Sequence, residues 1–67
     1  MAVARVTEIT ASSTKSFDDA VEAGIARATK TLNNVAGAWV EGQKVTVENG
    51  RISEWRVSLK VTFVLED

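Results

Sequence analysis

The residues best suited to chemistry lie in the last third of this chain, where aromatic and charged side chains alternate with apolar ones. Trp39, Glu41 and Gln43 are spaced two apart in one run, and Arg56 and Lys60 are an even number of positions apart in the next. In a β-strand, residues at such spacing share one face. An indole offers a flat surface, and an arginine can hold a phosphate through two parallel hydrogen bonds. The pattern indicates a face that lines a subunit interface or an enclosed cavity.

A simpler interpretation is that these charges pair with one another on a solvated surface. The basic and acidic residues concerned are Lys44, Arg51, Arg56 and Lys60 on one side and Glu41, Glu48 and Glu54 on the other. Opposite charges facing each other across strands contribute about 0.2–1 kcal/mol each. At the level of the sequence, the charges therefore fit a solvated outer face as well as a ligand site or a subunit interface.

The sequence argues against catalysis. It contains no histidine and no cysteine, so the usual base and nucleophile near neutral pH are missing. Asp18 and Asp19 are adjacent, but they fall in the first turn of an expected helix, where they complement the helix dipole. No P-loop and no GxGxxG pattern is present. We expect a binding protein that is not an enzyme.

The elements that position the candidate residues are two strands joined by a tight turn. Asn49-Gly50 lies between two alternating apolar runs, 36–48 and 51–65, and this dipeptide is typical of a two-residue hairpin turn. The turn places Glu48 opposite Arg51. Each arm could reach roughly 40 Å at about 3.3 Å per residue.

Regular pairing from this turn predicts which residues share a face of the sheet. The mostly apolar face, expected under the helix, carries the pairs Ala36–Phe63, Ala38–Val61, Val40–Leu59, Gly42–Val57 and Lys44–Trp55. The other face carries Gly37–Thr62, Trp39–Lys60, Glu41–Ser58, Gln43–Arg56 and Val45–Glu54, together with Val47 and Ile52. Trp55 is then a core residue. A bulge at Gly42 would shift part of this register.

A strand and a helix precede the hairpin. Residues 3–11 are rich in β-branched side chains, and 17–32 place apolar residues at helical spacing after the capping candidate Ser16. Asn33-Asn34 is expected to end the helix. The order strand–helix–strand–strand predicts a single α+β domain over residues 1–67, with a three-stranded antiparallel sheet partly wrapped around one helix.

Size and composition point to self-association. A chain of 67 residues without cysteine can use neither disulfides nor thiolate metal sites for stability, which leaves oligomerisation. The single helix, about 25 Å long for 17 residues, is too short to cover the hairpin. The net charge of −1 gives no basic footprint for nucleic acid or an anionic membrane. Without a signal-peptide-like or membrane-spanning segment, we expect a cytoplasmic protein.

The order and spacing of these pieces resemble the dodecin family over nearly the whole chain. The resemblance rests on the opening Val6-Thr7-Glu8-Ile9-Thr10-Ala11-Ser12-Ser13, on the helix end 26–35, and on the closing run 57–67. It implies a hollow homododecamer that binds or stores a small ligand. Members of this family bind flavins, some bind coenzyme A, and they are not known as catalysts.

The resemblance also assigns ligand-binding positions. The tryptophan that stacks on the flavin ring corresponds to Gly37, and Trp39 lies two residues later on the same face. The family's ring-binding glutamine corresponds to Arg56. Together with Glu41, Gln43 and Lys60, these residues form the predicted ligand site. Because glycine has no π-surface, the flavin site is expected to be altered or lost, and riboflavin or FMN remains a candidate ligand.

Calcium is the alternative ligand, since dodecin-like proteins that lack the flavin tryptophan include a group linked to calcium. No EF-hand spacing exists in the chain. In a symmetric shell, one carboxylate repeated around a threefold axis supplies several oxygens at once. Glu41, Glu66 and Asp67 are the candidate calcium ligands. Three hypotheses stay open: a shell with an organic ligand, a shell with cations on its axes, and a purely structural or adaptor assembly.

Overall fold

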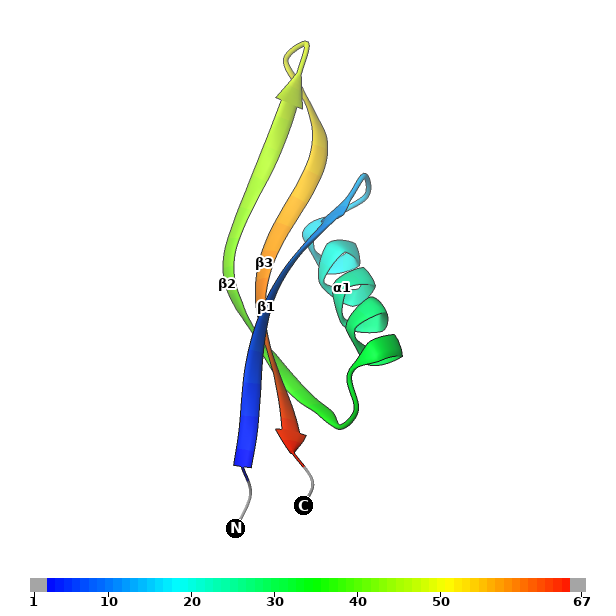
Figure 1. The fold of residues 1–67 in the computed structure, drawn as a ribbon. Helices are drawn as coiled ribbons and strands as arrows, with labels where there is room; N and C mark the ends of the chain where they lie inside the picture. The colour runs from blue at the N-terminus through cyan, green and yellow to red at the C-terminus, as the bar shows by residue number, and fades with distance from the viewer. Residues whose placement is uncertain (1–2, 66–67) are drawn as a thin grey trace.

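The computed structural model describes residues 3–65 as one sheet with one helix on its inner side. The elements are β1 (Val3–Ser13), α1 (Phe17–Thr31), β2 (Val35–Glu48) and β3 (Arg51–Leu65). The three strands are antiparallel in the order β1-β3-β2, so the last strand is central. The sheet curves around α1, as Figure 1 shows. The predicted fold class is confirmed.

The hairpin turn forms as its sequence predicts. Asn49 and Gly50 both have positive φ, at 52° and 76°, as a type I′ turn requires. Glu48 lies opposite Arg51. The turn chemistry therefore fixes where the two long strands start to pair.

Two β-bulges then displace the register of the middle of the hairpin. Glu41 on β2 and Ser53 on β3 are each left without an opposite residue. Because the extra residues lie on different strands, the shift from one is cancelled by the other. The predicted pairs outside the bulges, such as Trp39–Lys60, are confirmed.

The predicted pairs between the two bulges are wrong by one residue. Gly42 lies opposite Ser58, Gln43 opposite Val57, Lys44 opposite Arg56, Val45 opposite Trp55 and Thr46 opposite Glu54. A third bulge leaves Ala36 unpaired, so Val35 takes its expected place opposite Phe63. A one-residue shift exchanges the faces of a strand, and Gln43 and Val45 consequently join the side that carries α1.

The helix begins at the residue that its capping signal indicates and ends at Thr31, one residue before the predicted end. The Ser16 hydroxyl accepts a hydrogen bond from the backbone N–H of Asp19 at 3.0 Å, which satisfies a donor left free in the first turn. Lys30 lies in the last turn, where a cation suits the negative end of the helix dipole. Asn34 adopts a left-handed φ of 60° shortly after the helix. The chain is thereby redirected into β2.

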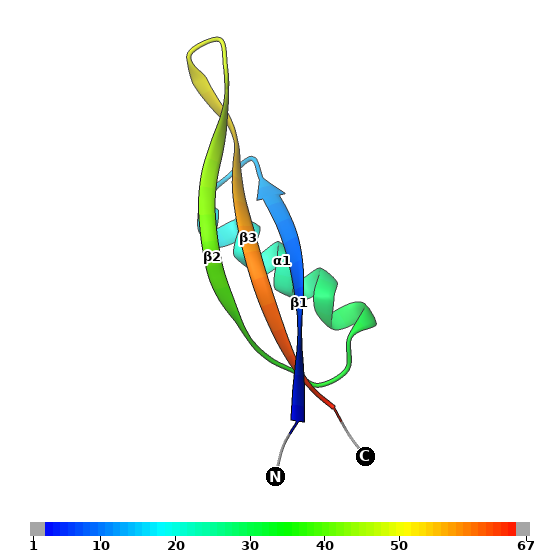
Figure 2. The same ribbon diagram turned by 60° about the vertical axis from the view of Figure 1, so that its left-hand side comes forward.

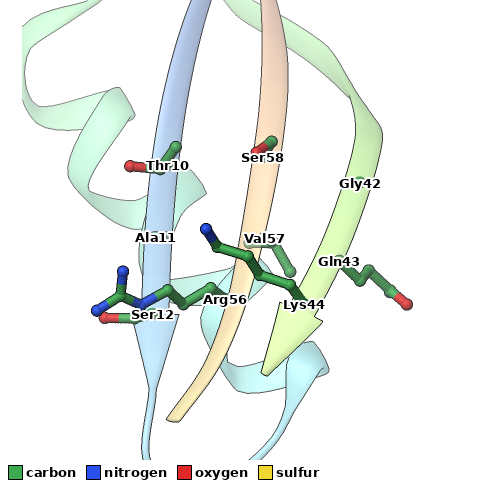
Figure 3. Close-up of a pocket in the computed structure, with 9 residues that line it drawn as sticks. All are labelled: Thr10, Ala11, Ser12, Gly42, Gln43, Lys44, Arg56, Val57 and Ser58. Carbon is green, nitrogen blue, oxygen red and sulfur yellow. The ribbon is translucent and has the colours of Figure 1, made fainter. Parts of the chain in front are cut away.

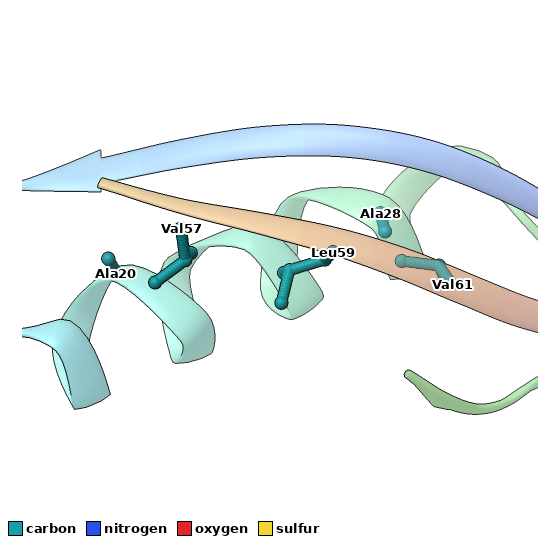
Figure 4. Packing of buried hydrophobic residues seen from close by; sticks show 5 residues of the cluster. All are labelled: Ala20, Ala28, Val57, Leu59 and Val61. Atoms are coloured by element: carbon teal, nitrogen blue, oxygen red, sulfur yellow. The ribbon is translucent and has the colours of Figure 1, made fainter. Parts of the chain in front are cut away.

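A small apolar core lies between α1 and the middle of β3 (Figure 4). Its buried members are Ala20, Ala28, Val57, Leu59 and Val61. Gly24 lets the helix approach closely, because a Cβ there would lie 2.9 Å from Leu59 Cδ1 and 3.1 Å from the Ala11 Cβ. No helix in residues 3–65 is long and apolar enough to cross a membrane.

The hairpin extends well beyond the helix that covers it. The molecule measures 51 × 19 × 13 Å, whereas the 15 residues of α1 span about 22 Å. Figures 1 and 2 show the turn of the hairpin far past the start of α1. Val45, Val47 and Ile52 near this tip are exposed. Trp55, expected in the core, is only half-buried because it lies opposite Ser13, where the helix cover begins to run out.

Candidate functional site

The face of the sheet that turns away from α1, here called the outer face, carries the candidate ligand residues. Its side chains form rows across the three strands, because directly opposite residues share a face. Trp39 belongs to a row with Lys60 and Glu8. Its side chain is the most exposed large apolar group in the described chain, at 74%.

Along β2, the outer face beside Trp39 is open, and the apolar Val6 lies on the same face in the next row, across β3 from Gly37. Gly37, on one side of it, would meet no atom within 4 Å if it carried a Cβ, and the same holds for Gly42. The exposed valines expected beside Trp39 instead lie on the helix side, since the bulges reverse the face of Val45 and Val47. The indole therefore lies beside open surface on β2, without the valines of the hairpin tip.

Two ion pairs occupy part of the outer face. The Lys60 Nζ lies 3.4 Å from the Glu41 Oε1. Arg56 donates two hydrogen bonds to the Glu54 Oε1, from Nη2 at 2.8 Å and from Nε at 3.2 Å. The charge pairing that the sequence left open is confirmed for these four residues. All four remain at least a third exposed at the side chain, and such pairs stabilise the chain only weakly.

A shallow pocket of about 380 Å³ lies next to the Trp39 row, on the side towards the hairpin turn. Figure 3 shows it crossing all three strands, with Lys44 and Arg56 in front of the sheet and Gln43 directed away from them. The lining residues come from β1, β2 and β3 and are Thr10, Ala11, Ser12, Gly42, Gln43, Lys44, Arg56, Val57 and Ser58. The volume falls in the range of small-molecule sites.

The structure thus brings together most of the predicted ligand residues. Gly37, Trp39, Glu41, Arg56 and Lys60 lie on the outer face. Gln43 does not, because it faces the helix side opposite the buried Val57. Lys44, one of the basic residues that the sequence offers for a phosphate group, was expected under the helix opposite Trp55. It takes the expected place of Gln43 opposite Arg56 instead, and the glycine at position 42 is the sequence signal for this exchange.

The predicted calcium ligands are not assembled in the described part of the chain. Glu66 and Asp67 lie outside the described residues. Glu41 is already paired with Lys60. Residues 3–65 contain no group of three or more acidic side chains that could hold a metal ion. A site shared between copies on a symmetry axis stays a prediction.

Comparison with known proteins identifies the family to which this chain belongs. The sequence profile of the dodecins matches residues 3–66. This chain belongs to the dodecin family. No curated protein sequence is significantly similar to it.

Several solved dodecins share the fold over nearly their whole length. The dodecin from Streptomyces davaonensis is 35% identical with a TM-score of 0.94, and the match covers 98% of this chain and 97% of that one. A T. thermophilus dodecin mutant is 30% identical with the same TM-score, and the match covers 100% of both chains. The calcium dodecin from Mycobacterium tuberculosis, described as having a novel calcium-binding site, is 28% identical with a TM-score of 0.83, over 96% of this chain and 91% of that one.

Proposed function

We propose that this dodecin assembles as a homododecamer and binds or stores a small planar ligand of flavin or nucleotide type on its outer face, without catalysing a reaction. The observation that carries the proposal is Trp39, which is 74% exposed beside the vacant surface at Gly37 and Gly42. Covering the apolar surface of an exposed indole is favourable, and aromatic rings stack on one another. A stacked ring would cover it.

Self-assembly is supported by the apolar surface that one copy leaves uncovered. Val47 and Ile52, which lie opposite each other next to the hairpin turn, are 60% and 47% exposed. Figure 1 shows that α1 does not extend to the tip of the hairpin. A small domain without disulfides gains stability by burying such surface against further copies. Dodecins assemble in this way.

The ring-binding geometry differs from that of flavin-binding dodecins. Gly37 occupies the position of their stacking tryptophan, and Trp39 lies about 7 Å farther along the strand. A flavin ring stacked on Trp39 is therefore displaced along β2 towards Gly42 and the pocket. This displacement predicts an altered affinity and an altered selectivity among flavins.

The first test is a flavin titration of Trp39→Ala, with Trp39→Phe as the conservative control. Stacking of a base on an aromatic side chain contributes about 1–3 kcal/mol, so Kd should rise about 5- to 150-fold in Trp39→Ala and much less in Trp39→Phe. Quenching of flavin fluorescence reports the affinity, and native mass spectrometry reports the number of copies. If both variants bind flavin as the wild type does, Trp39 is not the stacking residue.

Calcium binding is the alternative, motivated by the calcium dodecin from M. tuberculosis. In this chain Glu41 would have to leave Lys60 before it could bind an ion. Metal analysis after extensive dialysis separates the two hypotheses, since a retained ion without flavin affinity would favour calcium.

A further inference from the structure

We propose that Asn49, in the turn of the hairpin, is a site of spontaneous chemical modification at which the protein ages. The backbone nitrogen of Gly50 attacks the side-chain amide of Asn49, the amide is lost, and the product disturbs the tip of the hairpin. Asparagine is among the thermally labile residues, and the reaction needs water as its only co-reactant. The chemistry is independent of the proposed function, whereas its effect on the number of copies rests on the proposed self-assembly.

The reaction proceeds through a cyclic imide. The Gly50 nitrogen forms a bond to the Asn49 Cγ, the bond from Cγ to the amide nitrogen breaks, and ammonia leaves with the proton of the Gly50 N–H. Water then opens the ring at either of its carbonyl carbons. Opening at Cγ gives aspartate, and opening at the backbone carbonyl carbon gives isoaspartate, whose main chain runs through Cβ and Cγ.

The apex of the hairpin leaves the reacting groups accessible. Asn49 and Gly50 are both exposed, and a Cβ built on Gly50 would meet no atom within 4 Å. The last pair of the ladder is Glu48 with Arg51, so the turn residues lie outside it. Within residues 3–65, no backbone hydrogen bond holds the Gly50 N–H. The attacking nitrogen is therefore free to lose its proton to solvent.

The segment that must open before the reaction is short. The turn holds Asn49 in a left-handed conformation, with a φ of 52°, and attack on Cγ requires the backbone to rotate away from this geometry. Only two residue pairs separate the turn from the bulge at Ser53, and the inner pair, Val47 with Ile52, is exposed. Exposed ends with few buried contacts open at low cost in free energy. The reactive dipeptide thus lies on a segment that opens without unfolding of the core.

A second asparagine of the same chain provides the contrast. Asn34 is also exposed and also left-handed, with a φ of 60°, but the β-branched Val35 follows it and crowds the backbone nitrogen. The Asn34 carbonyl oxygen also accepts a hydrogen bond from the Val64 N–H at 3.0 Å, which holds the backbone against β3. Asn34 should therefore keep its amide while Asn49 loses it.

The isoaspartate product changes the length of the turn. It adds a methylene group to the main chain of a two-residue loop, and loop length selects the turn type and fixes the register of a hairpin. Both products also add a negative charge next to Glu48. The pair Val47–Ile52 then loses its fixed position, and with it the apolar surface that we expect other copies to cover. Aged chains should therefore assemble less well.

The first measurement is peptide mapping of wild-type protein kept in mildly alkaline buffer at physiological temperature. Trypsin, which cleaves after lysine and arginine, places Asn49 in peptide 45–51 and Asn34 in peptide 31–44. Chromatography with mass spectrometry distinguishes asparagine, aspartate and isoaspartate in each peptide. The amide of Asn49 should be lost about tenfold faster than that of Asn34, or faster still, which corresponds to a barrier lower by about 1.4 kcal/mol. The loss should accelerate with pH, because the attacking nitrogen must be deprotonated.

Asn49→Gly is the matched variant that cannot react. A Gly-Gly dipeptide also forms the two-residue turn with positive φ at both positions, so the variant should fold and assemble as the fresh wild type does. After the same incubation, native mass spectrometry should show fewer assembled copies for the wild type and an unchanged number for Asn49→Gly. Should the variant fail to fold, fresh and incubated wild type still provide the comparison.

The outcomes separate the modification from the proposed function. If the Asn49 amide is lost no faster than that of Asn34, the whole inference is overturned. If Asn49 is modified but the incubated wild type keeps its number of copies, the site is supported and its effect on assembly is wrong. If the fresh wild type is already a single copy, the proposed self-assembly is wrong, and the peptide map still decides whether Asn49 is the site.

Discussion

At the scale of single residues, the outer face is defined as much by its glycines as by its aromatic and charged groups. Gly37 and Gly42 leave vacant surface on both sides of Trp39. Neither Gly37 nor Gly42 has a positive φ, so both positions could carry a side chain without backbone strain. A single substitution at either glycine would therefore fill part of this vacant surface.

Gly37→Trp should restore a ring-stacking surface at the family position and strengthen flavin binding. The added indole meets no neighbouring atom close to its Cβ, and stacking contributes about 1–3 kcal/mol. We expect a gain in affinity of about 5- to 150-fold by fluorescence quenching. Gly37→Ala, which adds no ring, is the control. An unchanged flavin affinity in Gly37→Trp would mean that flavin cannot reach this surface in the assembled protein.

At the scale of elements, the closeness of α1 to the sheet depends on small side chains. Ala20, Gly24 and Ala28 form the buried stripe of the helix, and they oppose the larger Val57, Leu59 and Val61 of β3. Small residues on the helix and large residues on the strand fill the space between them without voids. A larger residue in the stripe must push the two layers apart.

Gly24→Val should destabilise the chain by about 1–3 kcal/mol through overpacking. Its Cβ would lie 2.9 Å from Leu59 Cδ1 and 3.1 Å from the Ala11 Cβ. Ala23→Val is the matched control, because position 23 is the neighbouring residue on the exposed side of the same helix. Denaturant unfolding of both variants provides the comparison. Equal stability of the two variants would contradict the close approach of α1 at Gly24.

At the scale of the whole molecule, the mismatch between a 51 Å length and a short helix is the dominant feature. It leaves apolar side chains exposed on the helix side of the hairpin tip, while most of the candidate ligand residues lie on the other side of the sheet. We therefore expect contacts between copies at the hairpin tip and contacts with a ligand on the outer face, which are different surfaces of one protomer. Mutations at the tip should affect assembly more directly than ligand binding.

Val47→Glu should break the assembly, because a charge replaces a side chain that we expect to be buried between copies. The number of copies, measured by native mass spectrometry at micromolar concentration, should fall below that of the wild type. Glu48→Gln, the adjacent residue on the opposite side of β2, should leave it unchanged. A well-folded single copy of the wild-type chain at this dilution would contradict the assembly as a whole.

Much of the fold could be predicted because its signals are local. The turn at Asn49-Gly50, the cap at Ser16 and the alternation of β3 each depend on neighbouring residues, and all are confirmed. The predicted order of elements and the family follow from these signals together. The candidate site was only partly predictable, since Trp39, Arg56 and Lys60 share a face as expected but Gln43 does not.

The sequence by itself determined the elements, the turn that starts the pairing and the residue types available for binding. Only the tertiary structure decided the two bulges, and with them the choice of Lys44 over Gln43 as the neighbour of Arg56. The physical reason is that a bulge depends on contacts between strands. The packing of Val57 and Leu59 against α1 and the hydroxyl contact between Thr46 and Ser53 hold this register, and neither contact is encoded by spacing along one strand.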